Sequence, residues 1–144
     1  MDKHIAAFQH AWPHLRAHNV DILDPLYTEQ VQFADPFHRC QGRTAFKAYL
    51  RSSYANVEHI QFTFKRRVAE PPLVCLEWML NLVHPRLNRG RPVMVPGISL
   101  LQFDEQGRVH AHRDYFDGAD LLYAQLPVVG PVVRWIRNRL SEPN

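Results

Sequence analysis

Residues 108–117, RVHAHRDYFD, bring two imidazoles and a carboxylate together in one short segment. The segment follows the turn-forming residues 104–107 and is typical of a β-strand, whose side chains alternate between two faces. The expected faces are His110, His112, Asp114 and Phe116 on one side, and Val109, Ala111, Arg113 and Tyr115 on the other. An imidazole beside a carboxylate can orient or transfer a proton. The polar face therefore either lines a cavity where it does chemistry, or meets water while the apolar residues face the core.

A second carboxylate, Asp35, precedes Pro36 at the end of a short predicted strand and is flanked by Phe33 and Phe37. Two carboxylates that face one apolar cavity repel each other and are poorly solvated, so one could act as an acid while the other stays ionised. Two structural alternatives remain open. Asp35 could cap a loop, and Asp114 could form an ion pair with a neighbouring arginine or histidine.

Length and composition favour one soluble domain over residues 1–144, since 46% of the residues are apolar and 22% are charged. The net charge of +3 is small and scattered, which argues against a nucleic-acid partner. Cys40 and Cys75 are the only cysteines, so no disulfide framework is predicted. The N-terminus has no signal-peptide pattern, and no apolar run is long enough to span a membrane. We therefore expect a cytoplasmic protein without a membrane partner.

Apolar periodicity places helices before strands. The predicted elements are helices at 3–18 (interrupted at Pro13), 19–29 and 44–54, strands at 31–35, 57–69, 73–84, 93–103 and 108–117, and helical structure over most of 118–140. Short connections between the later strands favour an antiparallel meander. The order predicts an α+β fold, in which a cone-shaped, curved antiparallel or mixed sheet is wrapped by the N-terminal helices. Such a sheet leaves a hollow suited to a small ligand.

The C-terminal segment 128–140 alternates apolar residues with three arginines. We expect it to lie near the mouth of the pocket as a lid, or at a subunit interface; a helix on a membrane surface is the less favoured interpretation. His10, His14 and His18 recur every four residues, but Pro13 interrupts their helix and no carboxylate or cysteine joins them. Neither a metal nor another cofactor is predicted.

The chain resembles the nuclear transport factor 2-like superfamily, in its SnoaL-like and ketosteroid isomerase-like branches. The matching segments are LYTEQVQFADPFH at 26–38, GRTAFKAYL at 42–50, GISLLQFDEQGRV at 97–109 and HRDYFD at 112–117. By this resemblance, Asp35 corresponds to the general base of ketosteroid isomerases, and Asp114 to the water-activating aspartate of limonene epoxide hydrolase-like proteins. Ser99 stands where isomerases carry an oxyanion-hole aspartate, and Trp78 and Leu80 stand where the hydrolases carry Arg-x-Asp.

The resemblance implies a homodimer that binds a small hydrophobic molecule. The protein is then either an isomerase or cyclase that needs no cofactor, or a ligand-binding or interaction module without chemistry. An epoxide hydrolase is less favoured. We expect Asp35 to be the base, and Asp114 with His112 to be the second acid–base or orienting group. The candidate ligand-binding residues are Trp78, Tyr27, Tyr54, Ser99, His38, Phe116 and Leu80. Trp78 and Leu80 could equally be plain core.

Overall fold

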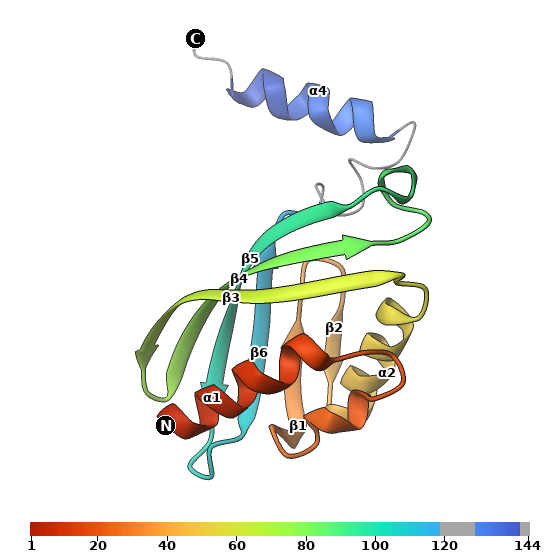
Figure 1. Ribbon diagram of the computed structural model, residues 1–144. Helices are drawn as coiled ribbons and strands as arrows, with labels where there is room; N and C mark the ends of the chain where they lie inside the picture. The colour runs from red at the N-terminus through yellow and green to blue at the C-terminus, as the bar shows by residue number, and fades with distance from the viewer. Residues whose placement is uncertain (119–128, 142–144) are drawn as a thin grey trace.

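The computed structural model describes residues 1–118 and 129–141 (Figure 1). Its helices are α1 (Asp2–Ala11), α2 (Arg43–Tyr54) and α4 (Val129–Ser141), with 3-10 turns η1 (Trp12–His14), η2 (Val20–Leu23) and η3 (Asn88–Gly90). Its strands are β1 (Tyr27–Ala34), β2 (Arg39–Gln41), β3 (His59–Glu70), β4 (Leu73–Val83), β5 (Val93–Phe103) and β6 (Val109–Phe116). The predicted helical residues 119–128 lie outside the described part of the chain.

The described strands form one mixed sheet in the order β2-β1-β6-β5-β4-β3. Neighbouring strands are antiparallel except β1 and β6, which are parallel. Figure 1 shows the sheet bending strongly, with α1 crossing one face and α2 packed beside β1 and β2. The predicted α+β class and curved sheet are confirmed. None of the described helices is both long enough and apolar enough to cross a membrane.

The four predicted antiparallel strands over residues 57–117 are confirmed as β3 to β6. Even-numbered apolar residues of β4, and of β3 as far as Phe64, face the concave side, where Phe62 pairs with Leu80 and Phe64 with Trp78. The register of β3 shifts between Phe64 and Arg67, so Val68 is 70% exposed on the other face. Trp78 is only 3% exposed. It lies against Gly97, and a Cβ atom added to Gly97 would overlap the indole ring. The close approach of β5 to Trp78 therefore requires a residue without a side chain.

Strand β6 contains an irregularity that changes which side chains face inward. Gln102 pairs with Ala111 and Phe103 pairs with Val109, so His110 is the extra residue of a bulge. Because the bulge interrupts the alternation, Val109 is fully buried, although it was expected on the same face as the exposed Arg113. The expected two-face division is wrong at this end of the strand, but it holds from Ala111 onward.

The helix predicted over residues 19–29 is wrong. Only the short turn η2 forms there, and β1 begins at Tyr27. Pro25 lies in the middle of the predicted helix, where it removes a backbone donor and clashes with the preceding turn. The chain therefore becomes extended early, and Tyr27 enters the core from the first position of β1, with no exposed surface. Pro13 does end the first helix, as expected.

Candidate active site

A cavity of about 480 Å³ lies between the concave face of the sheet, α2 and the residues that follow β4. Aromatic and aliphatic side chains make most of its wall, among them Phe33, Phe62, Trp78, Leu80 and Phe116. A cavity of this size accepts a small organic molecule. Both carboxylates singled out in the sequence, Asp35 and Asp114, also line it. The expectation that they share one hollow is thus met by the geometry.

Asp114 is anchored through one of its two oxygen atoms. Oδ1 lies 2.6 Å from Nε2 of His112 and accepts a hydrogen bond from the Ser99 hydroxyl at 2.5 Å. Behind these residues, Tyr27 contacts Nδ1 of His112 at 2.8 Å, and Trp78 donates its indole N–H to Ser99 at 2.9 Å. Asp114 Oδ2 has no hydrogen-bond partner within residues 1–118 and 129–141. Oδ2 is therefore the carboxylate oxygen available to a ligand.

An indole N–H group donates into this chain at each end. Trp12 donates to the Tyr27 hydroxyl at 3.1 Å, and this hydroxyl shares a hydrogen bond with Nδ1 of His112. Nε2 of His112 in turn contacts Asp114. From the other end, Trp78 donates to Ser99, which donates to the same carboxylate. Ser99 and His112 thus both contact the same oxygen of Asp114.

Tyr27, Ser99 and His112 are each no more than 3% exposed. Leaving a buried polar group without a partner costs about 1–3 kcal/mol, so a fully satisfied chain holds each member in place. We conclude that the chain fixes the position of the Asp114 carboxylate at the cavity wall. The geometry is compatible with the ion-pair alternative for Asp114, because the contact with His112 is an ion pair whenever the imidazole is protonated.

Asp35 has a different environment. Its Oδ1 accepts the backbone N–H groups of Phe37 and His38 at 2.8 and 2.9 Å, which is the geometry of an Asx turn. Its Oδ2 accepts the hydroxyl of Tyr49 at 2.6 Å. Both oxygen atoms are therefore engaged in holding the loop between β1 and β2 against α2. This geometry corresponds to the loop-capping alternative.

Two tyrosines of α2 reach the cavity. Burial, and then the hydrogen bond to Asp35, raise the pKa of Tyr49, while burial and the negative charge of Asp114 raise the pKa of Tyr54. Both hydroxyls thus keep their protons at neutral pH. Tyr49 uses its proton on Asp35, whereas the Tyr54 hydroxyl has no hydrogen-bond partner in the described part of the chain. Tyr54 can therefore donate to a ligand oxygen.

The remaining predicted ligand-binding residues fall into two groups. Trp78, Leu80, Tyr54 and Phe116 line the cavity, whereas Tyr27 and Ser99 lie behind the wall as supports of His112 and Asp114. His38 does not line the cavity; its ring stacks on Tyr49 with centroids 4.8 Å apart. Its contribution is thus to the loop that carries Asp35.

Sequence reasoning missed Trp12 and Tyr49 as site residues. Tyr49 lies one turn after Phe46 on the buried face of α2, so periodicity places it near the core but cannot show its contact with Asp35. Trp12 precedes Pro13 and gives no polar signal in the sequence. The described residues also contain no group of three histidine, cysteine, aspartate or glutamate side chains arranged to hold a metal.

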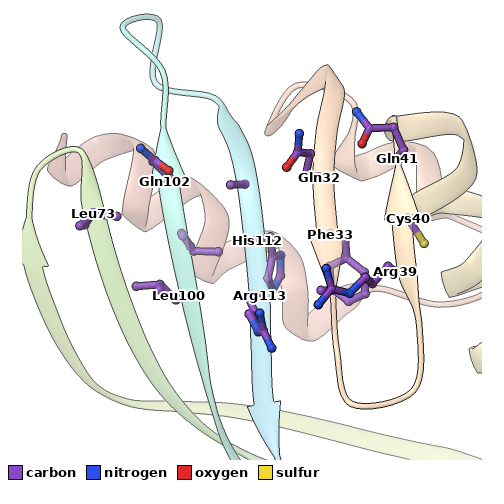
Figure 2. A pocket seen from close by; sticks show the side chains of 13 residues that line it. Gln32, Phe33, Arg39, Cys40, Gln41, Leu73, Leu100, Gln102, His112 and Arg113 are labelled. Atoms are coloured by element: carbon purple, nitrogen blue, oxygen red, sulfur yellow. The ribbon is translucent and has the colours of Figure 1, made fainter.

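The outer face of the sheet carries a separate, shallow groove of about 370 Å³ (Figure 2). Figure 2 shows Gln32, Gln41 and Gln102 toward one end, and Arg39 and Arg113 toward the other. This groove is on the opposite side of β6 from the Asp114 carboxylate. It lies within a face that exposes several large apolar side chains: Val68, Leu73, Met94, Ile98, Leu100 and Tyr115.

The profile of the SnoaL-like domain family matches residues 5–112 of this sequence. The chain belongs to the SnoaL-like domain family. The match covers α1 through the beginning of β6, which includes His112 and ends two residues before Asp114. No curated protein sequence matches the chain.

Solved structures share the fold at low identity. A protein with a ketosteroid isomerase-like fold from Catenulispora acidiphila, in complex with trimethylamine, is 18% identical with a TM-score of 0.71, over 85% of this chain and 90% of that one. A candidate SnoaL-like polyketide cyclase from Shewanella denitrificans is 21% identical, with a TM-score of 0.67, over 81% and 89%. A limonene epoxide hydrolase-like enzyme from Mycobacterium tuberculosis is 22% identical, with a TM-score of 0.66, over 94% of each chain. These likenesses establish the nuclear transport factor 2-like fold of this SnoaL-like protein.

Proposed function

We propose that this SnoaL-like protein binds a small hydrophobic carbonyl compound in its cavity and moves a proton at carbon, without a cofactor. The observation that carries the proposal is the position of Asp114: Oδ1 is held by His112 and Ser99, and Oδ2 is left for the ligand. A general base must be fixed close to the proton that it removes, and a supporting hydrogen-bond chain provides this.

Each residue has a role in this proposal. Asp114 Oδ2 takes a proton from a carbon next to the ligand carbonyl, and the Tyr54 hydroxyl donates to the oxygen that becomes negative. Returning the proton at another carbon gives an isomer, whereas attack of the enolate on a second carbonyl gives a ring. His112 keeps Asp114 in place. This assigns the base to Asp114 rather than to Asp35, both of whose oxygens accept hydrogen bonds within the protein.

Epoxide hydrolysis is the less favoured reaction. Opening an epoxide requires a group that protonates or polarises its oxygen. The positions at which the resemblance would put the Arg-x-Asp pair hold Trp78 and Leu80, and both are apolar parts of the cavity wall. Tyr54 remains as a donor, but a phenol with a raised pKa is a weak acid for this step.

A binding module without chemistry is the alternative, and it too has an observation in its favour. Every donor near Asp114 Oδ1 is buried, so the aspartate could serve only to satisfy these donors. Incubation of the protein in D2O with a small apolar ketone as the ligand separates the two functions. An acid–base catalyst will introduce deuterium at a ligand carbon faster than buffer alone, detected by mass spectrometry. A binding module will leave the exchange rate of that carbon unchanged.

We also propose that the protein is a homodimer that pairs through the outer face of its sheet. The support is the exposure of large apolar side chains on one face, including Met94 at 62% and Tyr115 at 49%. A group of large apolar side chains exposed on one face often marks an interaction surface. A second copy presents the same face, and its association would bury both.

A further inference from the structure

Helix α4 lies apart from the sheet, beyond the end at which the loop 84–92 connects β4 to β5 (Figure 1). An ion pair of 3.0 Å between Arg137 and Asp117 ties it to the end of β6. Its large apolar side chains remain in water: Trp135 is 62% exposed and Leu140 is 82% exposed. No side chain described in residues 131–141 lines the cavity. The lid expected from the sequence thus remains a prediction, and the large apolar side chains of α4 are exposed on the surface.

The exposed side chains of α4 form one amphipathic surface. Val132, Ile136 and Leu140 recur every four residues, and Trp135 and Arg139 form the adjacent row. The Arg139 guanidinium lies over the Trp135 ring, 5.7 Å from its centroid. Residues 129–141 contain three arginines and no acidic residue. The apolar face therefore includes a cation that has no carboxylate on its own helix.

This placement of Arg139 distinguishes between possible partners. In a packed protein interface, the guanidinium would lose its water and would need an acid from the other side. At a bilayer surface, the arginine can lie along the apolar region while its charge reaches lipid phosphates. Tryptophan prefers the same interfacial depth. The composition of α4 thus favours a lipid surface.

The loop 84–92 adds a second, independent observation. Arg86, Arg89 and Arg91 are exposed there, and residues 84–103 contain no acidic side chain. Figure 1 shows this loop and α4 at the same end of the molecule. An anionic bilayer attracts such basic residues by roughly 1 kcal/mol each. Nucleic acid would also attract the arginines, but it gives no reason for the exposed Trp135 and Leu140.

We propose that α4 and the loop 84–92 form a docking surface for an anionic lipid bilayer. Arg86 and Leu87 belong to this loop and also line the cavity, so docking would bring the cavity to the membrane surface. A hydrophobic ligand dissolved in the bilayer would then reach the cavity without crossing water. The docking surface is independent of whether Asp114 performs chemistry.

Flotation with vesicles tests this proposal on the full chain. The protein is mixed with vesicles of phosphatidylcholine alone, or of phosphatidylcholine with phosphatidylglycerol. Flotation is expected only with phosphatidylglycerol and should weaken as salt is added. Trp12 and Trp78 are buried, so a blue shift of the fluorescence on binding would report Trp135. Arg139→Ala should weaken binding about fivefold, the factor that corresponds to one interfacial arginine.

Arg67→Ala is the matched control, because it removes the same charge from β3 beside Asp2, at the opposite end from α4. It should leave flotation unchanged. Absence of flotation, equal flotation with neutral vesicles, or equal effects of Arg139→Ala and Arg67→Ala would each overturn the proposal. The proposal would also be overturned if, without lipid, the Trp135→Ala particle had a different mass in solution from the wild type, because this would identify α4 as a subunit contact.

Discussion

Nε2 of His112 lies 2.6 Å from Oδ1 of Asp114, in the middle of a hydrogen-bond chain that starts at a buried tryptophan on either side. Because an indole can only donate, each tryptophan donates into the chain, and both branches end at one carboxylate oxygen. The arrangement supports a base that is held in one orientation before a ligand arrives. It also couples the position of that base to residues that never touch the ligand.

Tyr27→Phe tests this coupling through stability. The variant leaves the Trp12 indole and Nδ1 of His112 without their partner in a site that water does not reach. We expect a loss of about 1–3 kcal/mol in the free energy of unfolding, measured by denaturant titration. Tyr49→Phe is the control, since it removes one bond from a partly exposed carboxylate and should cost less. Equal stability of Tyr27→Phe and wild type would contradict the assigned chain.

The buried tyrosines predict a loss of stability at alkaline pH. Burial is the first cause that raises the pKa of Tyr27, Tyr49 and Tyr54 above the ordinary value of 10.0. Since the unfolded chain ionises these groups near pH 10 and the folded chain does not, their contribution is complete below pH 10 and is lost as pH rises further. Tyrosinate absorbance should therefore show a late phase that coincides with unfolding. Tyr54→Phe should reduce the pH dependence of stability, and an unchanged dependence would argue against its burial.

Gly97→Ala tests the packing of the cavity wall. The added methyl group would overlap the Trp78 ring, so the indole must move and its bond to Ser99 must weaken. Overpacking of this kind costs roughly 1–3 kcal/mol. We expect a lower melting temperature and an altered tryptophan spectrum. Ile98→Ala, at the next position on the outer face, should leave that spectrum unchanged. If Gly97→Ala has the same spectrum as the wild type, the Trp78 ring is not tightly packed against position 97.

Leu100→Arg tests the proposed dimer. The new charge lies among the exposed apolar residues of the outer face and would be buried in a paired sheet without a partner. Light scattering after gel filtration should give about half the mass of the wild-type particle, while the far-ultraviolet spectrum stays the same. Ser52→Arg, on the exposed side of α2, should keep the mass of the wild type. A wild-type protein that is already monomeric would refute pairing through this face.

Much of the fold follows from local patterns in the sequence. Alternation over residues 57–103 predicts three strands and places Phe62 and Trp78 on the concave side, because one face of each strand must be buried. The bulge at His110 has no comparable signal, since it depends on how β6 pairs with β5. The start of β1 at Tyr27 depends on Pro25 and on parallel pairing with β6, which joins residues 79 to 82 positions apart.

The candidate site is less predictable than the fold. His112 and Asp114 are two residues apart in one strand, so their contact follows from alternation. By contrast, the contact of His112 with Tyr27 links residues 85 positions apart, and no spacing in the sequence indicates it. The same holds for the bond from Tyr49 to Asp35, which depends on how α2 packs against β1. The residue types indicate that Asp35 and Asp114 are candidate site residues. Their different roles depend on which carboxylate oxygen atoms lack a hydrogen-bond partner within the protein.

Deuterium exchange by two aspartate variants tests the central claim most directly. Asp114→Asn removes the proposed base and keeps its shape, whereas Asp35→Asn removes the charge at the loop cap. With a small apolar ketone in D2O, Asp114→Asn should lose carbon exchange about a hundredfold or more, while Asp35→Asn should retain most of it and melt at a lower temperature. Exchange by Asp114→Asn at the wild-type rate, or its abolition by Asp35→Asn in a fully stable protein, would contradict the account.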